Sequence, residues 1–275
     1  MKASIIGLGL MGGSMGLALK KSGMFKSISG FDVDELHLQQ ALSLGLIDEA
    51  ITLGESKESD VIFLAMPVDG IIGYLKESKN FLPHTLIIDL GSTKYEIVKN
   101  IPIDTRKNFV ASHPMCGTEH SGPKAAIEDL YKDKIVVLAD VEDSGEAQVA
   151  LAKEIFISIG MKIVKMDSKE HDRHAAFISH LPHIISYSLA NTVLKQEDPK
   201  SILTLAAGGF KDMSRIAKSS PNMWSEICKQ NKSFILESLE GFSTELEIVI
   251  NFIQNEEWGK LKEWMGRANK LHEIL

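Results

Sequence analysis

The sequence has few cysteines, no long apolar run and no excess of basic residues. Its two cysteines, Cys116 and Cys228, are too few for a disulfide-based fold, and they predict reduced thiols in the cytoplasm. No apolar stretch reaches the roughly 18 residues that a membrane span requires, and the glycine-interrupted start is unlike a secretory signal. With 30 Lys and Arg against 37 Asp and Glu, the net charge of −7 argues against a protein that binds nucleic acid through phosphates. We therefore expect a cytoplasmic protein with neither membrane nor nucleic acid as its partner.

Up to about Lys165 the chain alternates short β-rich runs with helical patterns. The predicted strands are mostly continuous apolar runs, as in parallel strands covered on both faces; they are Lys2–Ile6, Ser27–Asp32, Asp60–Met66, Thr85–Leu90, Phe109–Ser112, Lys134–Ala139 and Lys162–Met166. Between them, segments such as Asp34–Leu44 and Glu146–Ile159 carry apolar residues at helical spacing. This alternation predicts an α/β fold with a Rossmann-like, doubly wound sheet.

The pattern changes near Asp167, after which almost no strand signal remains. Helical stretches are predicted over Lys169–Leu194, Ala206–Lys218 and Asn222–Leu275, the last with breaks near Gly241 and Asn255. Ser168 is expected to cap the first of these helices. We therefore expect two domains, a Rossmann domain of residues 1–167 that binds NAD and an all-helical domain of residues 168–275.

A glycine-rich turn directly follows the first predicted strand and begins a helix. In this GxGxxG pattern Gly7 permits the tight turn, Gly9 lets the backbone approach a pyrophosphate, and Gly12 lets the helix pack closely on the strand. Leu10 and Met11 lie at the start of the helix, where N–H groups and the helix dipole favour negative charge. The turn therefore predicts a dinucleotide site.

Two later positions extend this predicted site. Asp32 ends the second predicted strand, where an acidic side chain binds the adenosine ribose and disfavours a 2′-phosphate. No Arg or Lys occurs in the four residues after it, so we expect NAD rather than NADP as the cofactor. Met66 and Pro67 follow the next strand and are expected beside the same crevice, because ligands bind at the carboxyl ends of parallel strands.

Four further motifs identify a family. They are DLGSTK at residues 89–94, SHPMCGTE at 112–119, HDRHAAFISHLPH at 171–183 and GGFKDMSRIAKSSPNMW at 208–224. Together with the glycine-rich turn, they resemble the motifs of the prephenate dehydrogenase family, which includes arogenate and cyclohexadienyl dehydrogenases. The resemblance covers nearly the whole chain. It implies a homodimer built by the helical domain and the NAD-dependent oxidative decarboxylation of prephenate to 4-hydroxyphenylpyruvate in tyrosine biosynthesis, with arogenate as the alternative substrate.

The resemblance also assigns catalytic residues. Hydride leaves the ring carbon that bears the hydroxyl of prephenate, so this hydroxyl must lose its proton. A neutral imidazole can accept that proton, and the matching residue is His113. Ser92 matches a family serine that contacts the same hydroxyl and orients the histidine.

Prephenate carries two carboxylates, and the resemblance implies a cationic binding site. Arg215 matches a family arginine, whose planar guanidinium can hold a carboxylate in bidentate fashion. Lys211, one helical turn earlier, is expected to add positive charge. Thr118 and Glu119 match residues that line the pocket and gate access to it, and Trp224 matches an aromatic residue near the pocket.

A second histidine is expected at the substrate. His183 matches a family residue that contacts the substrate without transferring the proton. Pro182 precedes it inside a helical stretch, and a proline there frees the carbonyl of Ile178 and bends the helix. We expect this bend to direct Ser179 and His183 toward the cleft.

Two alternatives concern other chemistry. The pairs His171/His174 and His180/His183 are spaced three apart, as in helical metal sites, and would suit a zinc-binding or NAD-sensing module. No cysteine lies nearby and a proline interrupts the second pair, so we expect no metal site.

Cys116 departs from the family pattern, and it is either activated by the basic pocket or buried and inert.

A related enzyme class fits the sequence less well. The β-hydroxyacid dehydrogenases also join a Rossmann domain to a helical domain, but they depend on a lysine in the first long helix of the second domain. The stretch from Glu170 to Val193 contains no lysine. The helical motif therefore favours the prephenate dehydrogenase resemblance.

Overall fold

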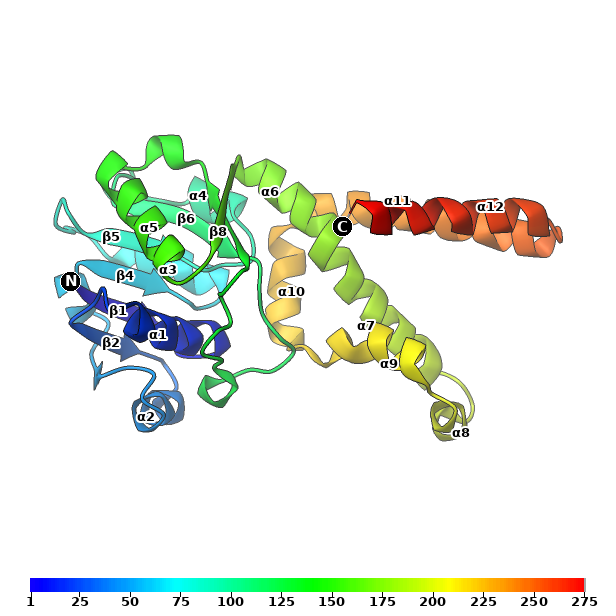
Figure 1. The fold of residues 1–275 in the computed structure, drawn as a ribbon, viewed down its shortest axis with the longest axis horizontal. Helices are drawn as coiled ribbons and strands as arrows, with labels where there is room; N and C mark the ends of the chain where they lie inside the picture. Colours follow the sequence, from blue (N-terminus) through cyan, green and yellow to red (C-terminus); the bar gives the residue numbers. More distant parts are fainter. Residues whose placement is uncertain (275) are drawn as a thin grey trace.

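The computed structural model describes residues 1–274, so only Leu275 of the predicted last helix lies outside it. Its N-terminal part is a sheet with helices on both faces, and helices alone follow (Figure 1). Within residues 1–274 the sheet has eight strands in the order β3-β2-β1-β4-β5-β6-β7-β8. The strands are β1 Lys2–Ile6, β2 Ser27–Phe31, β3 Glu49–Ala50, β4 Val61–Leu64, β5 Leu86–Asp89, β6 Phe109–Pro114, β7 Ile135–Ala139 and β8 Lys162–Met166. The predicted Rossmann-like sheet followed by a helical domain is confirmed.

Two features of the sheet differ from the expectation. The two-residue strand β3 was not predicted, because so short a segment has no periodicity to recognise. β7 runs antiparallel to β6, whereas the other neighbouring strands are parallel. An apolar run such as Ile135–Ala139 indicates burial, but the connection before it decides the direction of the strand.

Two apolar clusters hold the helices against the sheet. One cluster joins α1 (Leu10–Ser22) and α5 (Glu146–Ser158) to one face, through residues such as Met15 and Phe156. The other joins α3 (Val68–Glu77) and α4 (Tyr95–Lys99) to the opposite face, through residues such as Ile71. α2 (Glu35–Ser43) follows β2 at the edge of the sheet.

This topology gathers the predicted site at one edge of the sheet. β1, β2, β4, β5 and β6 are parallel, so their carboxyl ends all lie at that edge. The segments that follow β1, β2, β4 and β5 contain the glycine-rich turn, Asp32, Met66 and Ser92, and His113 lies at the carboxyl end of β6 itself. Motifs far apart in sequence therefore meet at one edge of the sheet, which is where open parallel sheets usually bind ligands.

The second part of the chain is helical. Its helices are α6 Ser168–Ala175, α7 Leu181–Leu194, α8 Pro199–Thr204, α9 Gly208–Ser214, α10 Pro221–Gln230, α11 Lys232–Gln254 and α12 Trp258–Asn269. A π-helical turn, Ala176–His180, joins α6 to α7. α11 and α12 pack against each other and project away from the sheet (Figure 1). None of the helices in residues 1–274 is long and apolar enough to cross a bilayer.

Two predicted details of these helices are wrong. Asp167, not Ser168, caps α6: its carboxylate accepts hydrogen bonds from the N–H groups of Lys169 and Glu170. The expected break near Gly241 is absent, because α11 continues through it, whereas the expected break near Asn255 is confirmed, since α11 ends at Gln254 and α12 begins at Trp258. A further turn at Asn231, between α10 and α11, was not predicted. One glycine weakens a helix by only about 1 kcal/mol, which the packing of a 23-residue helix can offset.

The glycines of the first turn offer a matched test of packing. A Cβ at Gly12 would lie 1.8 Å from the carbonyl oxygen of Gly7, whereas a Cβ at Gly9 would have no heavy atom within 4 Å. We expect Gly12→Ala to lower the free energy of unfolding by about 3 kcal/mol, and Gly9→Ala to change it by less than about 0.5 kcal/mol. Thermal and urea denaturation of the two variants measures the difference. Equal stability would contradict the close packing of α1 on β1.

Candidate active site

The glycine-rich turn has the geometry of a dinucleotide cradle. Gly7 has a φ of +92°, and a Cβ there would lie 2.6 Å from the carbonyl oxygen of Ala65. The backbone N–H of Leu8 donates to Oδ2 of Asp32 at 2.7 Å, so this carboxylate lies beside the turn. Space beside Gly9 is open to a ligand. These residues fit NAD, because a pyrophosphate can approach Gly9 while Asp32 remains able to accept a ribose hydroxyl.

The start of α1 suits an anion. It has no side-chain cap and no acidic residue in its first turn. The positive end of the helix dipole, at the N–H groups near Leu10 and Met11, is therefore not neutralised by a side chain of this turn. Met66 packs near Gly7 and Gly70, and Pro67 immediately precedes α3. The predicted cofactor residues therefore lie together at the same edge of the sheet.

His113 lies near the carboxyl end of β6 and begins a buried chain of hydrogen bonds. Its Nδ1 lies 2.8 Å from Nε2 of His171, and Nδ1 of His171 lies 2.8 Å from Oδ1 of Asp172. A carboxylate only accepts, so His171 donates from Nδ1, and in its neutral form it accepts at Nε2. His113 must then donate from Nδ1, which leaves its Nε2 as the unprotonated nitrogen.

Asp172 connects this chain to the neighbouring loop. Its Oδ1 also accepts the N–H of Lys94 at 2.7 Å, and its Oδ2 accepts the N–H of Tyr95 at 3.0 Å. The loop before Lys94 carries Ser92. One carboxylate on α6 thus holds both the histidine pair and the segment that contains the predicted catalytic serine.

Burial keeps His113 neutral. Removal from water lowers the pKa of this imidazole well below its ordinary value of 6.5, and the neighbouring His171, Lys94 and His180 lower it further. A neutral imidazole with a free Nε2 is the form that accepts a proton. His113 can therefore act as a base at neutral pH.

A second histidine group lies on the π-helical turn and α7. His183 stacks on Trp224 with ring centroids 3.7 Å apart, and its Nδ1 donates to the carbonyl of Ser179 at 2.9 Å. That bond leaves Nε2 of His183 free. His180 instead accepts from Asn231 at 3.1 Å, and burial lowers its pKa to about 4. The π-helical turn occurs where Pro182 frees the carbonyl of Ile178.

The cationic part of the site is paired with an acid. Arg215 donates to Oε2 of Glu119 at 2.9 Å and remains 55% exposed. It also lies close enough to His183 to lower the pKa of that imidazole, after burial, which has the larger effect. Arg215, Glu119 and His183 therefore form one group, joined through Trp224 to the buried His180.

Three predicted residues make fewer contacts. Ser92 is half-buried, and its hydroxyl forms no hydrogen bond within residues 1–274. Lys211 is exposed on α9. Thr118 is exposed, and its hydroxyl accepts the N–H of His120 at 3.2 Å. The geometry therefore leaves these three side chains free for other partners.

The buried residues His171, Asp172 and Lys94 were not predicted as parts of the site. His171 was considered only as a possible zinc ligand, yet it is occupied by His113 and Asp172. The adjacent His–Asp pair at the start of the helical motif was the available signal, because an acid beside a histidine often orients its ring. Lys94 lies in the same short motif as Ser92.

The surroundings of Cys116 do not activate its thiol. Burial raises the pKa of its thiol to about 12. Its thiolate is therefore scarce at neutral pH, which favours the alternative of an inert cysteine.

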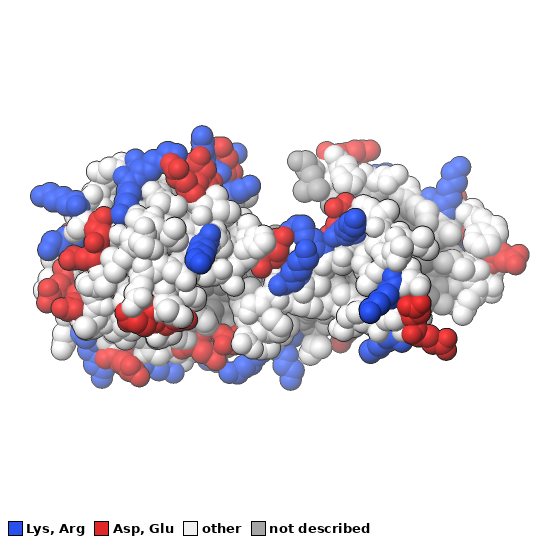
Figure 2. Space-filling model, turned by 90° about the horizontal axis from the view of Figure 1, so that it is seen from below, with Lys and Arg blue, Asp and Glu red and all other residues white. Residues whose placement is uncertain are grey.

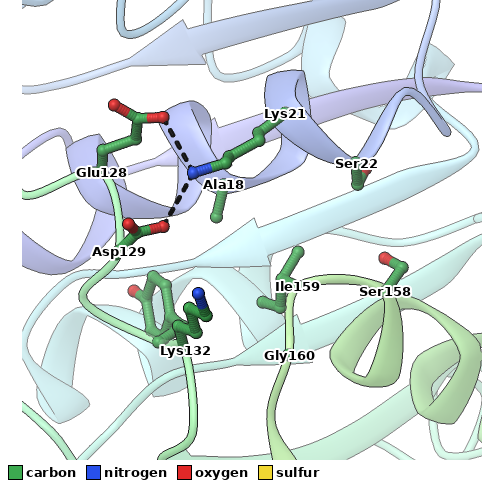
Figure 3. Close-up of a pocket in the computed structure, with 10 residues that line it drawn as sticks. Ala18, Lys21, Ser22, Glu128, Asp129, Lys132, Ser158, Ile159 and Gly160 are labelled. Carbon is green, nitrogen blue, oxygen red and sulfur yellow. Dashed lines mark hydrogen bonds and ion pairs between the residues drawn. The ribbon is translucent and has the colours of Figure 1, made fainter.

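Charge and cavities elsewhere do not compete with this site. Acidic and basic side chains are interspersed on the face drawn in Figure 2, so the attraction of an anion to this face must be local. A cavity of about 210 Å³ lies at the end of α1, where Lys21 pairs with Glu128 at 3.0 Å and Asp129 at 2.9 Å (Figure 3). None of the predicted site residues lines it.

Comparisons with known proteins agree with the motifs. Residues 15–165 match the family model for the prephenate dehydrogenase nucleotide-binding domain, and residues 167–267 match the prephenate dehydrogenase dimerization domain. The chain is 34% identical to prephenate dehydrogenase of Bacillus subtilis, with 100% of this chain and 76% of that protein covered.

Solved structures agree as well. The crystal structure of prephenate dehydrogenase from A. aeolicus in complex with hydroxyphenyl propionate and NAD+ has a TM-score of 0.93 at 31% identity, covering 100% of this chain and 98% of that one. Synechocystis arogenate dehydrogenase has a TM-score of 0.78 at 26% identity, covering 100% of this chain and 99% of that one. The resemblance predicted from the motifs is confirmed, and the chain belongs to the prephenate dehydrogenase family.

Proposed function

We propose that the chain is an NAD-dependent prephenate dehydrogenase that oxidises and decarboxylates prephenate to 4-hydroxyphenylpyruvate and carbon dioxide. The observation that carries the proposal is the buried chain Asp172–His171–His113, which ends in a free Nε2 at the same sheet edge as the glycine-rich turn. Bound NAD+, held by the turn and Asp32, supplies the hydride acceptor. The family relationship and the A. aeolicus complex with NAD+ support this function.

His113 handles the proton of the ring hydroxyl. Its Nε2 accepts the hydroxyl proton as the ring carbon loses hydride, so that the hydroxyl becomes a carbonyl. Cleavage of the bond to the ring carboxylate then releases carbon dioxide, and its electron pair completes the aromatic ring. The carbonyl oxygen becomes the phenol oxygen and recovers its proton from His113. Ser92, whose hydroxyl is free, is proposed to hold the same oxygen.

Asp172 and His171 set the form of His113. Through His171 the carboxylate keeps a proton on Nδ1 of His113, so that Nε2 faces the substrate unprotonated. The arrangement resembles the orienting role of the acid in hydrolase triads. Little further catalysis is needed, because aromatisation favours the loss of carbon dioxide and the protein mainly positions the reactants.

The anionic groups of the substrate are proposed to bind at Arg215 and His183. Arg215 is half-exposed and can turn from Glu119 to a carboxylate, so this ion pair would gate the pocket. His183 offers a free Nε2 beside Trp224. Lys211, Thr118 and Ser179 lie on the same segments as these residues and are proposed to line the pocket.

The larger organisation is also part of the proposal. Asp167 separates β8 from α6, which supports domains of residues 1–167 and 168–275. On α11, the exposed Leu246, Ile250 and Ile253 lie on one face, as residues four and three apart do. That face and the match to a dimerization domain support a homodimer. The two free cysteines support a cytoplasmic location.

A direct assay tests the proposed reaction. Purified protein with NAD+ is given prephenate or arogenate, and NADH formation yields kcat/KM for each. We expect turnover of prephenate, and a decrease in kcat of about 10²–10⁴-fold in His113→Asn, because the base is lost. Cofactor binding by the variant should match that of the parent protein. Preference for arogenate would change the assigned substrate, and unchanged turnover in the variant would refute the role of His113.

A matched pair of arginine variants tests substrate binding. Arg215 and Arg173 each have a side chain that is 55% exposed and paired with a glutamate, but only Arg215 lies at the proposed pocket. Arg215→Ala should raise KM for prephenate by about 10-fold or more, as expected from the loss of a charge-assisted hydrogen bond, whereas Arg173→Ala should leave KM unchanged. Steady-state kinetics with saturating NAD+ measures both. A large loss of kcat at unchanged KM would show that Arg215 has another role.

A further inference from the structure

A pair of charged side chains lies beside His113 and takes no part in the proton path described above. Asp89 ends β5, Lys94 immediately precedes α4, and both side chains are completely buried. The ammonium of Lys94 donates to Oδ2 of Asp89 and, at 2.5 Å, to the carbonyl oxygen of Ser112. Burial lowers the pKa of Lys94 and raises that of Asp89, and each partner opposes the shift of the other. A buried ion pair is costly to build, so it requires a structural or catalytic reason.

The pair supplies hydrogen-bond partners where the sheet does not. Pairing between β5 and β6 ends at Ile88 and Val110, two residues before Ser112. The N–H of Ser112 donates to Oδ1 of Asp89 at 2.9 Å, and its carbonyl accepts from Lys94. Both backbone groups of the residue before His113 are thus held by these two side chains. Without them, buried polar groups of β6 would lack partners.

The same pair holds the segment that carries Ser92. The N–H of Gly91 donates to Oδ2 of Asp89 at 3.0 Å, and the N–H of Lys94 donates to Asp172. We propose that Lys94, together with Asp89, is a positioning residue of the reaction, which fixes the backbone of His113 relative to Ser92. This inference rests on the proposed function, because it assigns the geometry a role in that reaction.

Lys94 also contributes charge near His113. The titratable groups that face this imidazole are His171 and Asp172 on α6, His180 on the π-helical turn, and Lys94 beside Asp89. Replacing the lysine by methionine removes a nearby positive charge, so protonation of His113 becomes easier. Its pKa should rise, and the acidic limb of kcat/KM should move to higher pH.

Two variants and one control test the proposal. Lys94→Met removes the cation, and Lys94→Met/Asp89→Asn also removes the uncompensated buried carboxylate, so the double variant should fold even if the single one does not. Each should reduce kcat by about 10²-fold, as displacement of a catalytic group by about 1 Å does, with NAD+ affinity unchanged. Lys99→Met, at an exposed position of α4, is the control and should match the parent protein.

The readouts separate positioning from folding. Kinetic pH profiles are measured with prephenate, and titration of ¹⁵N-labelled imidazoles by NMR gives the pKa of His113 without turnover. A raised His113 pKa with reduced kcat in folded protein supports the proposal. It is overturned if the double variant retains parental kcat, or if kcat falls only with the folded fraction while the His113 titration stays in place. Absence of prephenate turnover in the parent protein would overturn the proposed function instead.

Discussion

The rest of the site depends on the hydrogen bonds that the carboxylate of Asp172 accepts. It lies on the first helix after the sheet, and it accepts hydrogen bonds from His171, Lys94 and Tyr95. The last two belong to the sheet domain, so one buried acid both joins the domains and orders the histidines. The orientation of His113 is thus tied to the relative placement of the two parts of the chain, because no other described residue bonds its Nδ1.

Further contacts stabilise the same junction. Asp69 at the start of α3 accepts from Lys229 and Gln230 of α10, each at 3.2 Å. Thr93 donates to Gln230 at 3.0 Å, close to the segment that carries Ser92. These contacts are exposed or partly exposed, and each contributes little alone. Around the buried carboxylate, however, they help to hold the helical part of the chain against the edge of the sheet that carries Ser92 and His113.

The sequence allowed the fold class and the dinucleotide turn to be predicted because both depend on local patterns. Continuous apolar strands that alternate with helices, and the spacing of Gly7, Gly9 and Gly12 between a strand and a helix, are typical of this fold class. The direction of β7 was missed because the connection that precedes a strand decides its direction. The break at Asn231 was missed because the packing of α10 and α11 decides where the chain turns. The break predicted at Gly241 was wrong because the low helix propensity of glycine favoured a break, whereas α11 continues through this residue when packed.

The proposed proton path shows the limit of motif reasoning most clearly. His113 is assigned by its motif, but its partner His171 lies 58 positions away and only the folded chain brings them together. Histidines spaced three apart suggested metal ligands, although burial and Asp172 give His171 a different task. Likewise, Lys94 has the pattern of a surface residue in sequence, and its complete burial follows from where β5 and β6 separate.

The most direct test of this arrangement is the steady-state kinetics of Asp172→Asn with NAD+ and prephenate. The carboxylate accepts three hydrogen bonds on two oxygens, from His171 and from the N–H groups of Lys94 and Tyr95. An amide has only one oxygen acceptor, so the hydrogen bonds that orient His171 and His113 should be lost in part. We expect kcat to fall by about 10²–10⁴-fold while NAD+ affinity is retained. Parental kcat in a folded Asp172→Asn protein would contradict the proposed control of His113 by Asp172.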